Sequence, residues 1–157
     1  MNRYKTWMAA LAVLPATSLM AADQALSIVP GEWAIELKQK GGATYRDRSA
    51  EEGFSGVNDE RVLQNSTLCL GPDKAKLQPE MFAPHCTISN PRHTTRSFEA
   101  ELSCPHPAMR MEGSLTITTY DDGKKVIGTQ VMTGGGEKLG AVIINTLTMT
   151  RTGDCKD

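Results

Sequence analysis

Four cysteines are the residues of this chain whose type and spacing say most about its chemistry. The 157-residue sequence holds an even set, and every member follows a leader of secretory type. An even number of cysteines in a short exported chain predicts two disulfides rather than a metal or redox site. The four residues are Cys69, Cys86, Cys104 and Cys155.

The count alone leaves three ways of pairing these cysteines. We expect Cys69 to pair with Cys86, and Cys104 with Cys155. The first bridge would close the proline-containing segment between its two cysteines into a compact loop. The second would tie the C-terminal tail to the end of a strand, so both bridges would stabilise a small domain.

A soft-metal site is the alternative chemistry. His106, Met109 and Met111 form a ligand set suited to Cu(I) in an exported protein. A period of two places the two methionines on one strand face, however, where methionine ordinarily fills a core. Copper handling through these three residues is therefore the second interpretation, and we expect no cofactor.

Residue patterns for catalysis are weak. Ser55 lies in a Gly-Phe-Ser-Gly sequence that lacks the spacing of a nucleophile elbow. Glu99 and Glu101 share a strand face, as a glycosidase pair could, but charges on the wet face of an amphipathic strand are the commoner cause of this pattern. We expect that the protein is not an enzyme, and a hydrolase is the third interpretation.

The N-terminus has the pattern of a signal peptide. Two basic residues precede an apolar stretch from Trp7 to Met20, and two alanines follow it. The stretch is shorter than the roughly 20 residues of a comfortable membrane span. We expect a signal peptide of residues 1–22 and a single secreted β domain of residues 23–157, with no membrane span after cleavage.

Composition limits the classes of partner. The formal net charge is −1, and aromatic residues make up 5% of the chain. A nearly neutral chain has no electrostatic footprint for nucleic acid or anionic lipid. The length suits one domain, and its core must consist largely of Leu, Ile, Val and Met.

Apolar and polar residues alternate with a period of two through much of the chain, which predicts half-buried strands. The turn sequence Asp121-Asp122-Gly123 predicts a hairpin between its two flanking strands, and three glycines from Gly134 should break the chain before the last strand. The alternating stretches are residues 31–39, 98–102, 110–120, 124–133 and 143–150.

Two segments lack this alternation. Between Gly71 and Met81 the prolines predict one short helix. From Lys40 to Asn58 the chain is polar and glycine-rich, which predicts a long loop with Tyr45 and Phe54 as a lid over a ligand. We expect an all-β, mostly antiparallel domain of six to eight strands, built as a single curved sheet, an open barrel or a small sandwich.

Several motifs carry a family resemblance. The chain resembles a family of small Gram-negative envelope proteins that is known as domain of unknown function 3617. It departs from the family's pattern at Glu32 and Ala34, and the resemblance implies an envelope location and no established activity. The matching motifs are Pro30-Gly31-Glu32-Trp33, Cys69-Leu70-Gly71-Pro72-Asp73, the two middle cysteines and Gly153-Asp154-Cys155.

These observations together favour a non-catalytic binding or accessory module of the Gram-negative periplasm. Its partner would be a small apolar ligand or an envelope protein. A curved antiparallel sheet with a long loop offers a mouth and a lid, which is where such folds bind ligands.

Overall fold

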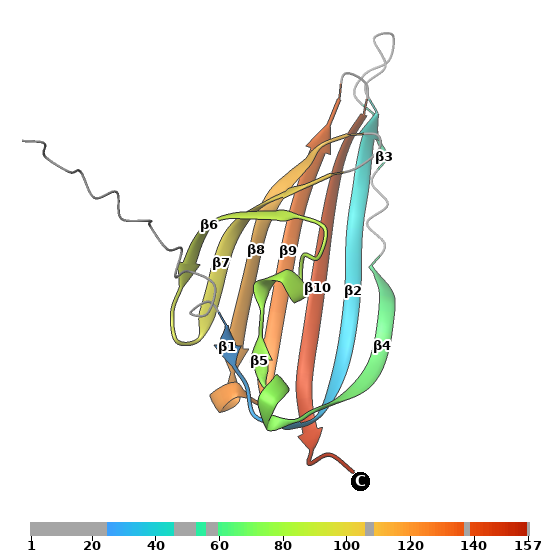
Figure 1. The fold of residues 1–157 in the computed structure, drawn as a ribbon. Helices are drawn as coiled ribbons and strands as arrows, with labels where there is room; N and C mark the ends of the chain where they lie inside the picture. The colour runs from blue at the N-terminus through green and yellow to red at the C-terminus, as the bar shows by residue number, and fades with distance from the viewer. Residues whose placement is uncertain (1–24, 46–52, 56–59, 106–108, 137–138, 157) are drawn as a thin grey trace, which may run out of the picture.

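The structure is a computed structural model, and it describes residues 25–45, 53–55, 60–105, 109–136 and 139–156 (Figure 1). The predicted signal peptide and its cleavage site lie outside these residues. No helix in the described part of the chain is long and apolar enough to cross a membrane. The strands are β1 (Leu26–Ser27), β2 (Gly31–Tyr45), β3 (Gly53–Ser55), β4 (Arg61–Leu70), β5 (Lys76–Leu77), β6 (Thr87–His93), β7 (Ser97–Cys104), β8 (Met111–Tyr120), β9 (Lys125–Gly135) and β10 (Leu139–Gly153), and the 3₁₀ turns are η1 (Pro72–Lys74), η2 (Pro79–Met81) and η3 (Asp121–Gly123).

Eight of the strands form one antiparallel sheet in the order β3-β2-β10-β9-β8-β7-β6, with β4 paired to β2 beside β3. The sheet curves but does not close into a barrel (Figure 1). The predicted all-β antiparallel fold is therefore confirmed, and a single curved sheet is the one of the three expected architectures that forms.

The core lies on the concave face of this sheet. Trp33 and Phe98 are completely buried there, and the alternation that the sequence shows sends Thr and charged side chains to the convex face. Few aromatic residues contribute, as the composition predicts. The buried hydrophobic residues of the sheet are Trp33, Leu70, Phe98, Ala100, Leu102, Met111, Leu115, Ile117, Val126, Met132 and Met149.

Residues 71–86, here called the strap, cross the concave face (Figure 1). The strap buries Ala75, Leu77 and Ala83, and its strand β5 pairs with β1. The predicted single helix is wrong in form, because η1 and η2 are separate 3₁₀ turns. Pairing with β1 holds the two residues of β5 extended, so a continuous helix cannot run through them.

The predicted hairpin is confirmed, since β8 and β9 pair along their length and η3 connects them. The predicted break before the last strand is present but starts later, since β9 runs through Gly135 and β10 begins at Leu139. The predicted loop from Lys40 is wrong over its first six residues, because β2 runs on through Tyr45. Both stretches pair with β10, and backbone hydrogen bonds to a partner strand require no apolar alternation.

All four cysteines form disulfides, but the expected pairing is wrong: Cys69 bonds to Cys155, and Cys86 bonds to Cys104. Strand register explains both bonds. The first pair of β6 and β7 is Thr87 with Ser103, so the preceding residue, Cys86, meets Cys104. Glu32 of β2 pairs with Cys69 on one side and with Gly153 on the other, which brings the C-terminal tail to β4.

Candidate ligand-binding groove

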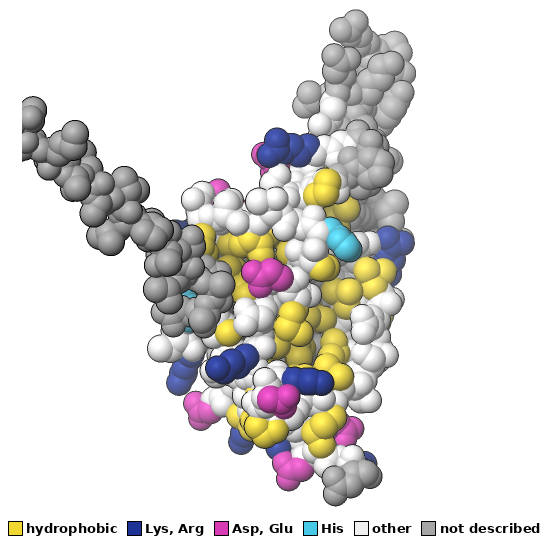
Figure 2. Space-filling view, viewed as in Figure 1, with side chains coloured by type: hydrophobic (Ala, Val, Ile, Leu, Met, Phe, Trp, Pro, Cys, Tyr) yellow, Lys and Arg dark blue, Asp and Glu magenta, His cyan; other side chains and the backbone are white. Residues whose placement is uncertain are grey.

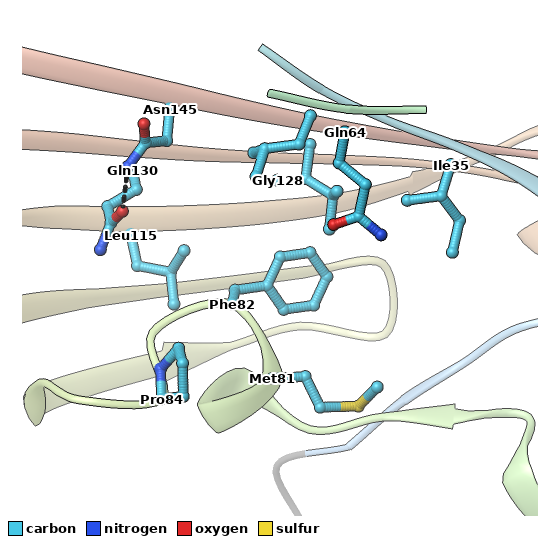
Figure 3. A pocket seen from close by; sticks show the side chains of 11 residues that line it. Ile35, Gln64, Met81, Phe82, Pro84, Leu115, Gly128, Gln130 and Asn145 are labelled. Atoms are coloured by element: carbon cyan, nitrogen blue, oxygen red, sulfur yellow. Dashed lines mark hydrogen bonds between the residues drawn. The ribbon is translucent and has the colours of Figure 1, made fainter. Parts of the chain in front are cut away.

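A cavity of about 330 Å³ opens between the strap and the concave face of the sheet; we call it the groove. Figure 2 shows apolar side chains reaching the surface beside the strap on this face. The walls of the groove are mostly apolar, and they include the side-chain amides of Gln64, Gln130 and Asn145 (Figure 3). The lining residues are Ile35, Leu37, Gln64, Met81, Phe82, Pro84, Leu115, Gly128, Gln130, Asn145 and Leu147.

A close contact between the strap and the sheet forms one wall of the groove. Gly128 of β9 is buried under the ring of Phe82, and a Cβ atom added to Gly128 would lie 2.5 Å from the ring carbon Cδ1. The glycine pairs with Ile117 and Leu147, both of which carry large side chains. The sheet therefore has a recess at this one position, and the ring of Phe82 fills it.

Hydrogen-bonded amides cross the sheet along another wall. We call Gln39, Asn145 and Gln130 the amide row. The Nε2 of Gln39 donates to the Oδ1 of Asn145 at 3.0 Å, and the Nδ2 of Asn145 donates to the Oε1 of Gln130 at 2.7 Å. The three residues are direct neighbours in register on β2, β10 and β9. The row therefore links polar side chains on a face that is otherwise apolar.

Both ends of the amide row have partners. Arg61, at the start of β4, donates from its guanidinium to the Oε1 of Gln39 at 2.6 Å. At the other end, the Nε2 of Gln130 contacts the Sγ of Cys86 at 3.9 Å. The row thus runs from an exposed cation at the sheet edge to the disulfide that anchors the strap.

Among the described residues that line the groove, none is ionisable. The charged groups lie elsewhere, as Lys38 illustrates. On the convex face the ammonium group of Lys38 contacts the carboxylates of Glu36 at 3.2 Å and Glu60 at 3.4 Å. The hydrogen bond to Glu36 is the largest cause that raises the pKa of Lys38, and the negative charges of Glu36 and Glu60 act in the same direction. The groove itself is uncharged and suits a neutral or apolar molecule.

The predicted lid residues, Tyr45 and Phe54, are described only in their backbone. The backbone of Tyr45 ends β2 and that of Phe54 lies in β3, but the side chains of both lie outside the described residues. Tyr45 is eight residues along β2 from Leu37, or roughly 26 Å at the rise of a strand. Among the described residues, Phe82 and Met81 of the strap border the groove.

The copper ligands of the second interpretation are only partly described. His106 lies outside the described residues. The Sδ atoms of Met109 and Met111 both approach Gly134, and Met111 is a buried core residue. Among the described residues, no three His, Cys, Asp or Glu side chains gather into a metal-binding group.

The residues weighed for catalysis lie apart from the groove. Glu99 pairs with Arg92 at 3.7 Å, and Glu101 accepts a hydrogen bond from Asn90 at 2.7 Å. Both glutamates are exposed on the convex side of β7. The side chain of Ser55 is outside the described part.

The groove residues were missed because each looks unremarkable in isolation. Asn145 lies between Ile143 and Leu147 on the apolar face of β10. A polar residue at that position is the sequence signal that could have marked the groove. Gln130 and Gly128 interrupt the same face of β9 in the same way. Only the register shows that these interruptions meet.

Three motifs of the family resemblance meet at one end of the sheet, where Glu32 pairs with both Cys69 and Gly153. The two middle cysteines instead form the disulfide that Gln130 of the groove contacts. Arg151 donates from Nε to the carbonyl oxygen of Pro30 at 2.8 Å and also pairs with the carboxylate of Asp154. The indole of Trp33 donates to the carbonyl oxygen of Val29 at 3.1 Å. Gly31 has a φ of +144°, a conformation that favours glycine. The motifs at this end therefore join β2, β4 and β10.

No curated protein and no solved structure matches the chain. A family model described as a protein of unknown function (DUF3617) matches residues 28–155. Because that match covers most of the sequence, the chain belongs to the DUF3617 family.

Proposed function

We propose that this protein is a non-catalytic binding module of the Gram-negative periplasm, and that it holds a small, mainly apolar ligand in the groove. The observation that carries the proposal is the groove itself, an uncharged cavity of about 330 Å³ with apolar walls and a few convergent amides. Small-molecule sites have this combination of shape and lining.

Two features support a location outside the cytoplasm. Residues 1–22 have the pattern of a signal peptide. The two disulfides are typical of proteins that fold in an oxidising compartment. The periplasm meets both conditions in a Gram-negative cell.

Titration with N-phenyl-1-naphthylamine, a neutral apolar dye that fluoresces on leaving water, tests the proposal. We expect saturable binding of one dye per chain by the disulfide-bonded protein. Leu147→Trp places an indole in the groove and should weaken binding at least about tenfold, or roughly 1.4 kcal/mol. Native mass spectrometry of protein purified from periplasm should show a retained small molecule.

The matched control is Val142→Trp, which also introduces an indole on β10 but five residues away and on the other face, where the native side chain is 43% exposed. This variant should bind the dye like the native protein. Equal weakening by both variants, with both still folded by circular dichroism, would place the dye outside the groove and contradict the proposal.

A further inference from the structure

We infer that the groove selects a neutral ligand through an acceptor oxygen, such as that of an ester, amide or ketone, and that Arg61 sets this selectivity without lining the groove. The inference rests on the proposed function and names the class of ligand for the same cavity. It follows from the direction in which the amide row donates its hydrogen bonds.

Arg61 fixes that direction because a guanidinium has donors and no acceptor. Its partner atom on Gln39 must therefore be the oxygen Oε1, at 2.6 Å. The nitrogen of Gln39 then faces Asn145 and donates to its Oδ1, which leaves the nitrogen of Asn145 to donate to Gln130. Each amide has one donating and one accepting end, so one cation orients the whole row.

The row ends with a donor on Gln130, one of the residues that line the groove. Once the Oε1 of Gln130 has accepted from Asn145, its Nε2 is the remaining end, and its contact in the described part of the chain is the disulfide sulfur of Cys86 at 3.9 Å. Sulfur is a weak acceptor. A chain of hydrogen bonds polarises its members, so this N–H group is a strong donor for a ligand oxygen.

The groove should disfavour a ligand that carries an ionised carboxylate in place of the neutral carbonyl group. A carboxylate also offers acceptor oxygens, but burying it without a paired cation is very costly. Arg61 is exposed and is separated from Gln130 by two amides, and no residue in the described lining of the groove is charged. A neutral carbonyl compound with an apolar body offers an acceptor oxygen to Gln130 and carries no charge that would have to be buried.

The first experiment measures displacement of N-phenyl-1-naphthylamine by methyl decanoate, undecane and sodium decanoate at pH 8. Methyl decanoate should compete about fivefold better than undecane because it accepts one hydrogen bond. Decanoate should be the weakest of the three, and lowering the pH to 4 should restore its competition because the acid becomes neutral. Gln130→Leu should abolish the advantage of the ester, whereas Asn65→Leu, an amide change on the exposed side of β4, should preserve it.

The second experiment reverses the amide row from its far end. In Arg61→Glu the new carboxylate only accepts, so all three amides should turn over and present the Oε1 of Gln130 to the groove. Methyl decanoate should then lose its advantage, and 3-hexylindole, which donates an N–H and accepts nothing, should compete about fivefold better than with the native protein. Arg61→Lys keeps a donor at this position and should keep the native preference.

The outcomes separate this inference from the proposed function. If the native protein binds neither dye nor ester, the proposed function is wrong. If the dye binds but ester, alkane and acid compete equally, the groove binds ligands and the acceptor-oxygen inference is wrong. If the ester is preferred and Arg61→Glu leaves that preference unchanged, the role assigned to Arg61 is overturned.

Discussion

The ring of Phe82 lies against the backbone of Gly128, and this contact seats the strap on the sheet. The two residues come from segments that the sequence separates by more than forty positions. Because the recess exists only where a side chain is missing, the wall of the groove depends on a glycine in the middle of a strand.

Gly128→Ala should destabilise the protein, because the new methyl group and the ring of Phe82 would occupy the same space. We expect a loss of about 1–3 kcal/mol in the free energy of unfolding, the usual cost of overpacking. Urea denaturation of the native and variant proteins measures it. In a Phe82→Ala background most of this cost should disappear, and an equal cost in both backgrounds would show that the contact is not its source.

The two disulfides should have different effects on binding. Replacing Cys86 and Cys104 by serine frees the end of the strap, so dye binding should fall with a stability loss of about 3 kcal/mol. Replacing Cys69 and Cys155 should cost more stability, about 4.5 kcal/mol, because the loop is longer, yet the groove should still bind dye below the unfolding temperature. A dye affinity that falls equally in both variants would contradict the role of the strap.

Peptide mapping under non-reducing conditions should link Cys69 to Cys155 and Cys86 to Cys104. Strand register places the partners together, so we expect each peptide pair in nearly stoichiometric yield. Intact mass should show no free thiol. A peptide that joins Cys69 to Cys86 would contradict the register of β6 and β7.

Copper binding is expected to be absent. Met111 is 6% exposed, and its sulfur lies against Gly134, so it is placed as core filler rather than as an open ligand. Competition with the Cu(I) chelator bicinchoninate should show no stoichiometric uptake, and changing His106, Met109 and Met111 together should leave any metal content unchanged. Sub-micromolar Cu(I) binding that the triple variant loses would support the copper interpretation instead.

The mature protein should begin near Ala22 or Asp23. The basic start, apolar stretch and small residues of the leader are the features that a signal peptidase recognises. N-terminal sequencing of the periplasmic protein checks this directly. A protein that retains Met1 in the periplasmic fraction would contradict the cleavage, with a periplasmic marker enzyme as the control for fractionation.

The sequence by itself determined the strands and their faces, because side chains alternate across a strand with a period of two regardless of what the strand pairs with. The hairpin of β8 and β9 follows from such local signals, and so does the oxidised state of the cysteines. The family is also carried by local motifs, from Pro30 to Trp33 and at Gly153 to Cys155.

Tertiary structure alone decided which residues meet. The pairing of Cys69 with Cys155 depends on β2 lying between β4 and β10. Residues 40–45, the start of the expected loop, are strand because β10 supplies a partner. The amide row likewise needs Gln39, Asn145 and Gln130 at one level of three adjacent strands. Register between distant strands is set by the packing of the whole sheet, so no local pattern could align these amides or place the strap above them.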